Sequence, residues 1–576
     1  MTTQNQRTIR FVRAPKFILV WFAPLVFLAI FYFYPLGSIL GISFGREQVS
    51  FATPFLDVFG SASVRNVLYF TFWQAAISTI LTLMIGLPGA YLFARYNFRG
   101  KSFILALTAV PFVMPTLVVA AAFNALLGPN GWVNLVLMEG FNLPQPPIQF
   151  VNTIYAILLA HIFYNTTIVL RMVGDFWSHL DPRITQAARV LGASRWGTLR
   201  HITFPLLLPS IAASALLVFI FDFTSFGVIL VLGGPQYATL EVEIYYQTIS
   251  LFNLPLAAAL SVIQLACTLA MTIIYTRLST RISRPLSLQP RGFTQKRLTS
   301  WSSRILASLM IVLLLALFTL PLLALAGRSF TRLGPERGQL GDVTRGFTLD
   351  FYKELSVNRR ESLFYAPPTR AIAVSLGYAT ATIVFALALG MPAAWALARN
   401  DSRANRVLDP IIMLPLGTSA VTLGLGFIIA LGRPPLDLRA SPLLIPIAHT
   451  LVAFPFVVRS LTPSLRSIRP RLRQAAAVLG ASPSQITRLI DIPLVGRALL
   501  VAAAFAFTIS MGEFGATALI ARPEYPTIPL AIYRFISQPG ALNYGQALAL
   551  STILMVITAV GMIAIERFRI ADIGEF

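Results

Sequence analysis

The stretch Gln186-Ala187-Ala188, three residues, Gly192, nine residues, Ile202-Thr203-Phe204-Pro205 occurs twice in this chain. The second copy reads Gln474-Ala475-Ala476, three residues, Gly480, nine residues, Ile490-Asp491-Ile492-Pro493. The two copies lie 288 residues apart, which is half of the 576 residues. Each copy is a polar, basic insert between long apolar segments, which predicts a cytoplasmic loop between two membrane helices. A paired loop in turn suggests a paired partner.

The composition predicts an integral membrane protein, because 56% of the residues are hydrophobic and only 12% are charged. The apolar residues fall in runs of about 20, the length that crosses a bilayer core as a helix. The predicted fold class is therefore all-α, with about twelve transmembrane helices. The twelve runs are 17–40, 66–94, 103–127, 151–170, 206–232, 254–276, 305–327, 371–398, 408–431, 443–460, 494–520 and 544–566.

The net charge of +23 is explained by the membrane topology and does not indicate a nucleic-acid-binding surface. Basic residues gather before the first span and in 95–101, 171–200 and 277–304, and twelve spans from a cytoplasmic N-terminus place all of these on the cytoplasmic side. Both termini are thus expected in the cytoplasm, the basic side facing anionic lipid and no nucleic acid bound. The first apolar run is long enough for an uncleaved helix. The single cysteine, Cys267, provides no disulfide or Cys-based metal framework.

The internal repeat extends beyond the two loops. His161 and Arg171 match His449 and Arg459 at the same 288-residue offset, whereas the segment from Gly86 matches that from Gly390 at an offset of 304. Six spans per half is an even number, so we expect two parallel six-helix repeats. The predicted domains are 1–276 and 305–576, joined by a basic cytoplasmic linker at 277–304 that contains no acid.

Each repeated loop, at 181–205 and 469–493, is expected to contain a short helix. Asp181 is a favourable N-cap, Pro182 suits the first helical position, and Gly192 suits the left-handed position that ends a helix. In the second copy Arg469 is a poorer cap. The small alanines permit close approach of a partner. The flanking arginines are expected to reach acidic groups on that partner; they are Arg189, Arg195, Arg471 and Arg473.

At these residues the chain resembles the permeases of bacterial ATP-binding-cassette importers, whose loop carries Glu-Ala-Ala, three residues, Gly, nine residues, Ile-x-Leu-Pro. Both copies here have Gln in place of Glu, and Phe204 or Ile492 in place of Leu. The resemblance implies that the loops are coupling helices for an ATPase. The residues implied are Gln186, Ala187, Ala188, Gly192, Ile202, Pro205, Gln474, Ala475, Ala476, Gly480, Ile490 and Pro493.

The same resemblance implies the partners: two copies of a cytoplasmic ATP-binding-cassette ATPase, and an extracytoplasmic substrate-binding protein that docks on the outer loops. It also implies the bacterial cytoplasmic (inner) membrane. No Gly-x-x-x-x-Gly-Lys-Ser/Thr occurs in the sequence, so we expect no nucleotide site in this chain. The chain is then not an enzyme and binds no cofactor of its own, and ATP with Mg²⁺ belongs to the partner ATPase.

Ionisable residues within the fifth span of each half indicate a substrate pathway, because such residues are costly in a membrane. Acids, hydroxyls and rings together would suit a small organic cation or a hydrated metal ion. The alternative is that each acid pairs with a buried neighbour. His161 and His449 favour a repeated hydrogen-bonding role over metal binding, and no metal site is predicted. The candidate pathway residues are Asp222, Thr224, Ser225, Phe226, Ser510, Glu513 and Phe514.

The substrate is addressed by a finer resemblance. Residues 221–245 look like the fused thiamine permeases, and Gly128-Pro129-Asn130-Gly131-Trp132 looks like that group and the related ferric-iron permeases. Thiamine or a related small cation is the predicted cargo, and ferric iron stays open as the alternative. A secondary transporter driven by an ion gradient is less favoured, because such a protein has no repeated docking loop.

Overall fold

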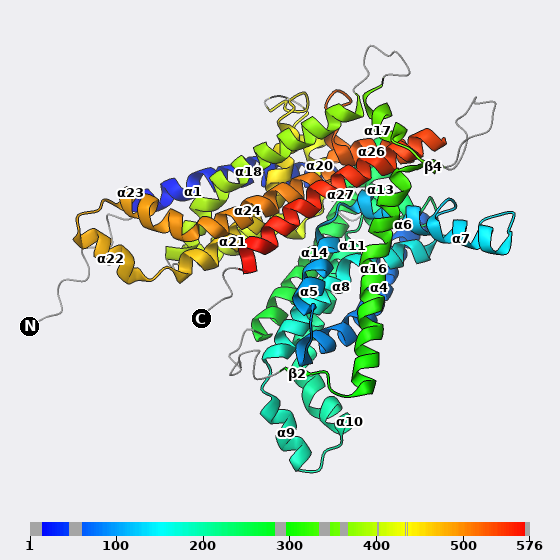
Figure 1. Ribbon diagram of the computed structural model, residues 1–576. Helices are drawn as coiled ribbons and strands as arrows, with labels where there is room; N and C mark the ends of the chain where they lie inside the picture. The colour runs from blue at the N-terminus through cyan, green and yellow to red at the C-terminus, as the bar shows by residue number, and fades with distance from the viewer. Residues whose placement is uncertain are drawn as a thin grey trace, which may run out of the picture. The chain divides into compact units, whose positions relative to one another are not determined.

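The computed structural model describes residues 14–44, 60–282, 295–332, 346–357, 367–399, 403–432, 434 and 436–570 (Figure 1). Within these ranges the chain is almost entirely helical, which confirms the predicted all-α class. Arg7, Arg10 and Arg13, residues 283–294 of the predicted linker, and residues 333–345 and 358–366 lie outside the described residues.

The first half of the chain forms a run of long helices interrupted by short ones. Its helices are α1 (Ala14–Leu28), the π-helix η1 (Ala29–Phe33), α2 (Tyr34–Phe44), α4 (Ala62–Arg95), α5 (Lys101–Val113), α6 (Thr116–Leu127), α7 (Trp132–Phe141), α8 (Ile154–His179), α9 (Pro182–Val190), α10 (Arg195–Thr198), the π-helix η2 (Leu199–Thr203), α11 (Phe204–Phe223), α12 (Gly227–Leu232), α13 (Leu240–Ile249) and α14 (Leu254–Ile282).

The second half follows the same plan. Its helices are α16 (Trp301–Ser329), α17 (Asp350–Lys353), the 3-10 helix η3 (Glu354–Ser356), α18 (Pro368–Arg399), α19 (Arg403–Met413), the 3-10 helix η4 (Leu414–Gly417), α20 (Ala420–Ala430), α21 (Leu444–Ser467), α22 (Pro470–Val478), α23 (Pro483–Ile486), the π-helix η5 (Thr487–Asp491), α24 (Ile492–Gly512), α25 (Gly515–Ile520), α26 (Ile528–Ile536) and α27 (Ala541–Ile570).

Eleven helices of the described chain are long and apolar enough to span a membrane, or twelve if one bent pair is counted as a span. The bent pair is the third apolar run of the second half, where α19 and η4 meet α20 at 95°. The equivalent run 103–127 was predicted as one helix, and that prediction was wrong. It is broken between α5 and α6, because Pro115 lacks an amide proton and forces Met114 into an extended conformation.

The fifth run of each half is also broken, which the sequence-based prediction missed. The predicted span 206–232 ends its long helix at Phe223 and resumes as α12 at Gly227. The predicted span 494–520 ends at Gly512 and resumes as α25 at Gly515. Both breaks fall within the segments that carry the candidate pathway residues.

Equivalent helices pack in the same way in the two halves. In one half α4, α8 and α11 contact one another, and in the other α18, α21 and α24 do so. A Cβ placed on Gly86 would lie 2.7 Å from Val169, and one on Gly390 would lie 2.5 Å from Val457. Glycine is therefore needed at both positions to let the helices approach so closely.

The compact units of the structure are not the two halves in sequence. One unit contains α1 and α2 together with α18 to α25, and the other contains α4 to α17 together with residues 531–555. In the first unit α1 packs on α18 and α2 packs on α20, and in the second α16 packs on α6. The first helix of each half therefore belongs to the unit built mainly from the other half. The domain limits proposed above describe the repeat in sequence and stay a prediction.

Four two-residue strands are the only ones in the described ranges. β1 (Tyr96–Asn97) pairs in parallel with β2 (Lys296–Arg297), and β3 (Thr331–Arg332) pairs antiparallel with β4 (Gly346–Phe347). The end of the predicted linker is therefore bound to the loop that follows α4, rather than being a free tether along its whole length.

Candidate functional site

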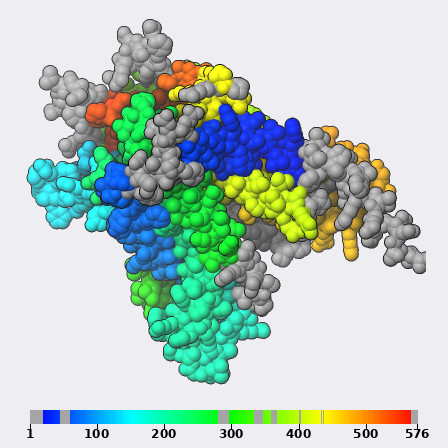
Figure 2. Space-filling view, turned by 180° about the vertical axis from the view of Figure 1, so that it is seen from behind, coloured from blue at the N-terminus to red at the C-terminus, as the bar shows by residue number. Residues whose placement is uncertain are grey.

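The first repeated loop has the helix that its sequence predicts. The Asp181 carboxylate accepts a hydrogen bond of 2.8 Å from the Arg183 amide, and Pro182 is the first residue of α9. The helix ends at Val190, and Gly192 has a φ of +88°. The predicted cap and the predicted stop are therefore confirmed. In Figure 2 the turquoise surface of residues near 190 forms one end of its unit.

The second loop repeats this geometry with a weaker start. Arg469 precedes α22 and makes no capping hydrogen bond with its side chain, as expected. Gly480 has a φ of +84°, and the Ala481 amide donates to the Ala476 carbonyl at 3.0 Å, as Ala193 does to Ala188 in the first loop. The two loops thus share one helix-and-turn conformation.

Each loop presents two large apolar side chains to solvent just before its glycine. Val190 and Leu191 are 87% and 86% exposed, and Val478 and Leu479 are both 87% exposed. Exposed apolar pairs of this kind mark protein contact surfaces. The sequence reasoning missed them, although an apolar pair directly before the glycine in both copies was a readable signal.

The remaining loop residues divide by exposure. Gln186, Ala187, Gln474 and Ala475 are exposed on the helices, whereas Ala188 is buried and Ala476 half-buried. Past the turns, Ile202 and Ile490 are half-buried where η2 and η5 lead into the next long helices, and Pro205 and Pro493 are exposed within the first turn of those helices.

One flanking arginine has a role that differs from the expected one. Arg473 donates from Nε to Asp491 Oδ1 at 2.7 Å, and Asp491 is completely buried. This ion pair joins α22 to η5 inside the second loop, so Arg473 is engaged within its own loop rather than held for a partner. The equivalent positions in the first loop are Thr185 and Thr203. Arg189, Arg195 and Arg471 are exposed.

His161 lies at the centre of a buried polar network between α4, α8 and the end of α11. Its Nδ1 is 2.9 Å from the Ser78 hydroxyl and 3.4 Å from Asp222 Oδ1, and its Nε2 is 2.9 Å from the Ser225 hydroxyl. Asn165 donates to Asp222 Oδ1 at 2.6 Å. Asp222 is 1% exposed, and its second carboxylate oxygen has no hydrogen-bond partner.

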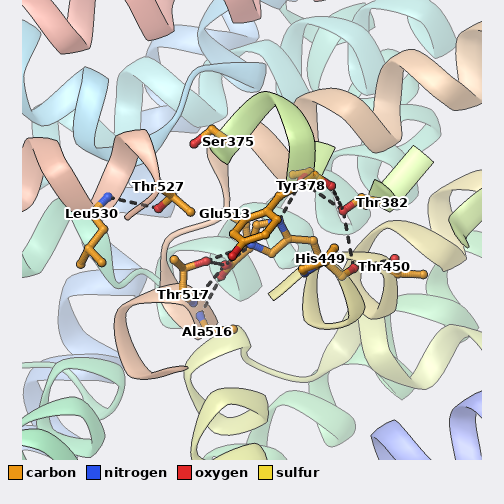
Figure 3. Close-up of polar contacts among 12 residues, drawn as sticks. Ser375, Tyr378, Thr382, His449, Thr450, Glu513, Ala516, Thr517, Thr527 and Leu530 are labelled. Atoms are coloured by element: carbon orange, nitrogen blue, oxygen red, sulfur yellow. Dashed lines mark hydrogen bonds and ion pairs between the residues drawn. The ribbon is translucent and has the colours of Figure 1, made fainter. Parts of the chain in front are cut away.

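His449 occupies the same place in the other half (Figure 3). Its Nδ1 is 2.7 Å from the Ser510 hydroxyl, and its Nε2 is 3.2 Å from Glu513 Oε2. The Ala516 amide donates to Glu513 Oε1 at 2.7 Å, and the Thr517 hydroxyl donates to Oε2 at 2.6 Å. Glu513 therefore holds the first turn of α25 as well as the histidine.

The structure thus brings Asp222 and Ser225 together around one histidine, and Ser510 and Glu513 around the other. The other candidate pathway residues lie at the helix breaks: Thr224 donates to the carbonyl of Ile220, and Phe226 and Phe514 are buried where α12 and α25 begin. The hydrogen-bonded role weighed for the histidines is what the structure shows. A role of these residues in substrate passage stays a prediction. Among the described residues no three His, Cys, Asp or Glu side chains gather as metal ligands would.

The long apolar helices define a multi-pass membrane protein, and its two exposed loops share one helix-and-turn conformation. The family model of the binding-protein-dependent transport system inner membrane component matches residues 83–284. The thiamine transport system permease protein ThiP of Brucella abortus (strain 2308) is 30% identical over 507 residues, covering 87% of this chain and 87% of that protein. The chain therefore belongs to the family of inner membrane permeases of binding-protein-dependent ATP-binding-cassette importers.

Two further similarities were found. ThiP of Escherichia coli (strain K12) is 28% identical over 491 residues, covering 83% of this chain and 85% of that protein. Among solved structures, a bacterial ABC transporter involved in the import of the acidic polysaccharide alginate matches with a TM-score of 0.40 at 19% identity, covering 48% of this chain and 100% of that chain.

Proposed function

We propose that this chain is the permease of an importer for thiamine or a related small aromatic cation. The observation that carries the proposal is the similarity over nearly the whole chain to proteins named as thiamine permeases in two genera. A parallel pair of fused halves provides the complete pathway in one chain. The proposal keeps both termini in the cytoplasm, where the basic loops and the linker face anionic lipid.

The apolar tips of the two coupling helices support the proposed partners. Two copies of a cytoplasmic ATPase dock at Val190–Leu191 and Val478–Leu479, bind ATP with Mg²⁺ and hydrolyse it. A substrate-loaded binding protein docks at the opposite ends of the spans. Coupling requires that ATP and the binding protein each favour one of two permease conformations. The chain itself then contributes no catalytic residue.

In this proposal the buried acids influence the cargo electrostatically, without contacting it. Asp222 and Glu513 each lie beside a histidine and at a helix break, so their carboxylates are fixed in place. A passing cation favours the ionised form of such a carboxyl group, and the negative charge then lowers the electrostatic cost of that cation without touching it. Thr224, Ser225, Phe226, Ser510 and Phe514 position the broken helices around that passage.

The test of cargo is uptake of labelled thiamine by proteoliposomes that contain the full chain, its ATPase and its binding protein. We expect uptake to require ATP on the side of the membrane where the ATPase lies. We also expect an excess of unlabelled thiamine to abolish uptake of the label. Uptake of ferric iron with no uptake of thiamine would overturn the cargo. Uptake without the ATPase, driven by a proton or sodium gradient, would overturn the importer class.

Coupling is tested at the two turn glycines. Gly192→Val and Gly480→Val in one chain force a β-branched residue into a left-handed conformation, which costs about 1–3 kcal/mol at each turn and displaces the apolar tips. We expect the variant to insert normally but to lose ATP-driven uptake. Gly496→Val is the matched control, because Gly496 lies within helix α24 and a Cβ there meets nothing within 4 Å. Normal uptake by the double variant would contradict the coupling assignment.

A further inference from the structure

A cavity of about 410 Å³ lies at the end of α16, within a single compact unit. Its walls come from that helix end, from α17, from the start of α27 and from Asn130. Asn130 belongs to the Gly128–Trp132 motif, which the proposed function leaves without a role. The predicted topology places this end of α16 outside the cell, and Figure 1 shows it at the opposite end of α16 from β2.

The charge that dominates this cavity is the guanidinium of Arg328. The Arg328 side chain is 4% exposed, and its Nη1 donates only to Thr331, to the hydroxyl at 2.8 Å and to the carbonyl at 3.3 Å. Its Nε has no hydrogen-bond partner, and no carboxylate of the described chain lies within ion-pair distance of it. A buried charge without a counter-charge is costly, so a built cavity beside it favours an anionic occupant.

The other polar groups of the cavity are suited to the same occupant. The Tyr544 hydroxyl is buried without a partner and is free to donate. Asn130, which carries an amide group, also lines the cavity. Arg332 adds a second positive charge, although its own Nη2 is bound to Asp350 at 2.7 Å. Guanidinium, phenol and amide donors that converge on one space form the usual setting for an oxyanion.

The walls of the cavity are tightly packed at two glycines. A Cβ on Gly545 would lie 2.3 Å from the ring of Phe351, and a Cβ on Gly327 would lie 2.2 Å from the ring of Trp132. These glycines let two aromatic rings pack flush against the helices that carry Tyr544 and Arg328. The motif around Asn130 therefore anchors one wall through Trp132 while Asn130 itself lines the space.

We propose that this cavity is a binding site for an oxyanion, namely a phosphate or carboxylate group carried by a small molecule or by a lipid headgroup. The site is distinct from the path proposed for a cationic cargo, because the Arg328 charge, which no carboxylate of the described chain balances, repels a cation. The proposal does not depend on the identity of that cargo. Occupation of the cavity would neutralise Arg328 and hold the end of α16 against α27.

The test uses the full-length permease, purified in detergent without anionic lipid, and inorganic phosphate as the probe. Thermal unfolding is followed by tryptophan fluorescence in phosphate and in sodium chloride of equal ionic strength. We expect a saturable rise of the unfolding temperature that is specific to phosphate. Arg328→Gln should weaken the apparent affinity by about tenfold or more, since it removes the charged donor. Arg304→Gln, at the other end of the same helix, should leave the affinity unchanged.

A second variant keeps the test decisive if Arg328→Gln does not fold. Tyr544→Phe removes one hydroxyl and should weaken phosphate binding several-fold, by about the value of one hydrogen bond to a charged group. Nanodiscs then distinguish a lipid headgroup from a free anion. If the phosphate effect is lost in phosphatidylglycerol but kept in phosphatidylcholine, the site binds a headgroup. If the effect is kept in both lipids, the site binds a free anion. The proposal is overturned if phosphate acts no differently from chloride, or acts equally on both cavity variants and on the wild type.

Discussion

The two histidine networks share a frame and differ in where the acid lies. His161 and His449 occupy equivalent positions, with Ser78 and Thr382 contributing hydroxyls from equivalent helices. In one network the acid is Asp222, in the last turn of α11, and the matching residue in the other half is Ser510. In the other network the acid is Glu513, three residues further along, where the first half has Ser225.

Because of this shift of three residues, the two acids make different hydrogen bonds. Glu513 follows the end of α24, and both of its oxygens accept hydrogen bonds from the first turn of α25. Asp222 still lies within a helix, receives one amide hydrogen bond from Asn165, and has one oxygen without a partner. The repeat therefore keeps the histidine and a carboxyl group beside it, but only one acid also builds a helix start.

The largest effect is expected from Glu513→Gln, compared with Asp222→Asn. The first change puts an amide group against amide and hydroxyl donors and removes charged hydrogen bonds, so it should destabilise the protein by about 2–4 kcal/mol. The second keeps an oxygen for Asn165 and should cost about 1 kcal/mol. Thermal unfolding of the two purified variants measures the difference.

Glu524→Gln is the control for that pair, because Glu524 is half exposed and contacts Arg522 at the surface. It should change stability by less than about 0.5 kcal/mol. Equal losses for Glu513→Gln and Asp222→Asn would show that capping of α25 contributes nothing, and that the two networks are equivalent after all.

A second effect should be the same in both halves. Gly86→Ala and Gly390→Ala each place a methyl group against the facing valine at less than 3 Å, so the helices must separate. We expect each to cost about 1–3 kcal/mol, the usual range for overpacking, and the two values to agree. Gly377→Ala, at a position on α18 where a Cβ meets nothing, should be neutral or slightly stabilising. Unequal values measured by thermal unfolding would mean that the repeat does not extend to helix packing.

The two repeated loops allow a third comparison, because among the described residues only the second loop contains an ion pair. Asp491→Asn leaves Arg473 without its buried partner and should destabilise α22 by about 2 kcal/mol, discounted for the partial exposure of Arg473. Amide hydrogen exchange in α22 reports this loss directly. Exchange in α9 serves as the internal control.

The combined change Arg473→Thr with Asp491→Thr gives the second loop the residue pair of the first loop. Removing both charges should restore most of the protection that Asp491→Asn loses, since no charge is left buried and unpaired. If the double variant is as unprotected as Asp491→Asn, the pair is not what distinguishes the loops.

Much of this fold can be predicted from the sequence because membrane spans and short caps are local signals. Apolar length identifies the long helices, and Asp181 with Gly192 identifies both ends of α9. The broken spans were missed because hydropathy averages over the break. Met114 before Pro115 was a local sign of the first break. The break between α24 and α25 has no such local sign, because the contacts through which Glu513 caps α25 are visible only in the structure.

The site was harder to predict, because its contacts join residues far apart in sequence. The spacing of the repeat identified His161 with His449. Nothing in one sequence shows that Ser78 contacts His161, or that Thr382 contacts the Ser510 that is bound to His449. Asp491 stands at the unconstrained position of the repeated motif, and its pairing with Arg473 depends on how α22 folds back on η5. Periodicity gives the face of a helix, whereas the partner on that face is set by tertiary packing.

The smallest effect concerns the starts of α9 and α22, the helices of the two repeated loops. Asp181→Ala removes a capping hydrogen bond and should cost α9 about 1 kcal/mol, whereas Arg469→Asp adds a cap to α22 and should stabilise it by about 0.5–1 kcal/mol. Hydrogen exchange of the first-turn amides measures both changes in opposite directions. Arg471→Asp is the control, since its charge lies inside the first turn rather than at the cap, so it separates a general charge effect from capping. If Arg469→Asp and Arg471→Asp protect α22 equally, the difference between the loops is electrostatic and the capping argument fails. If only Arg469→Asp does so, the weaker start of α22 is a property of one residue.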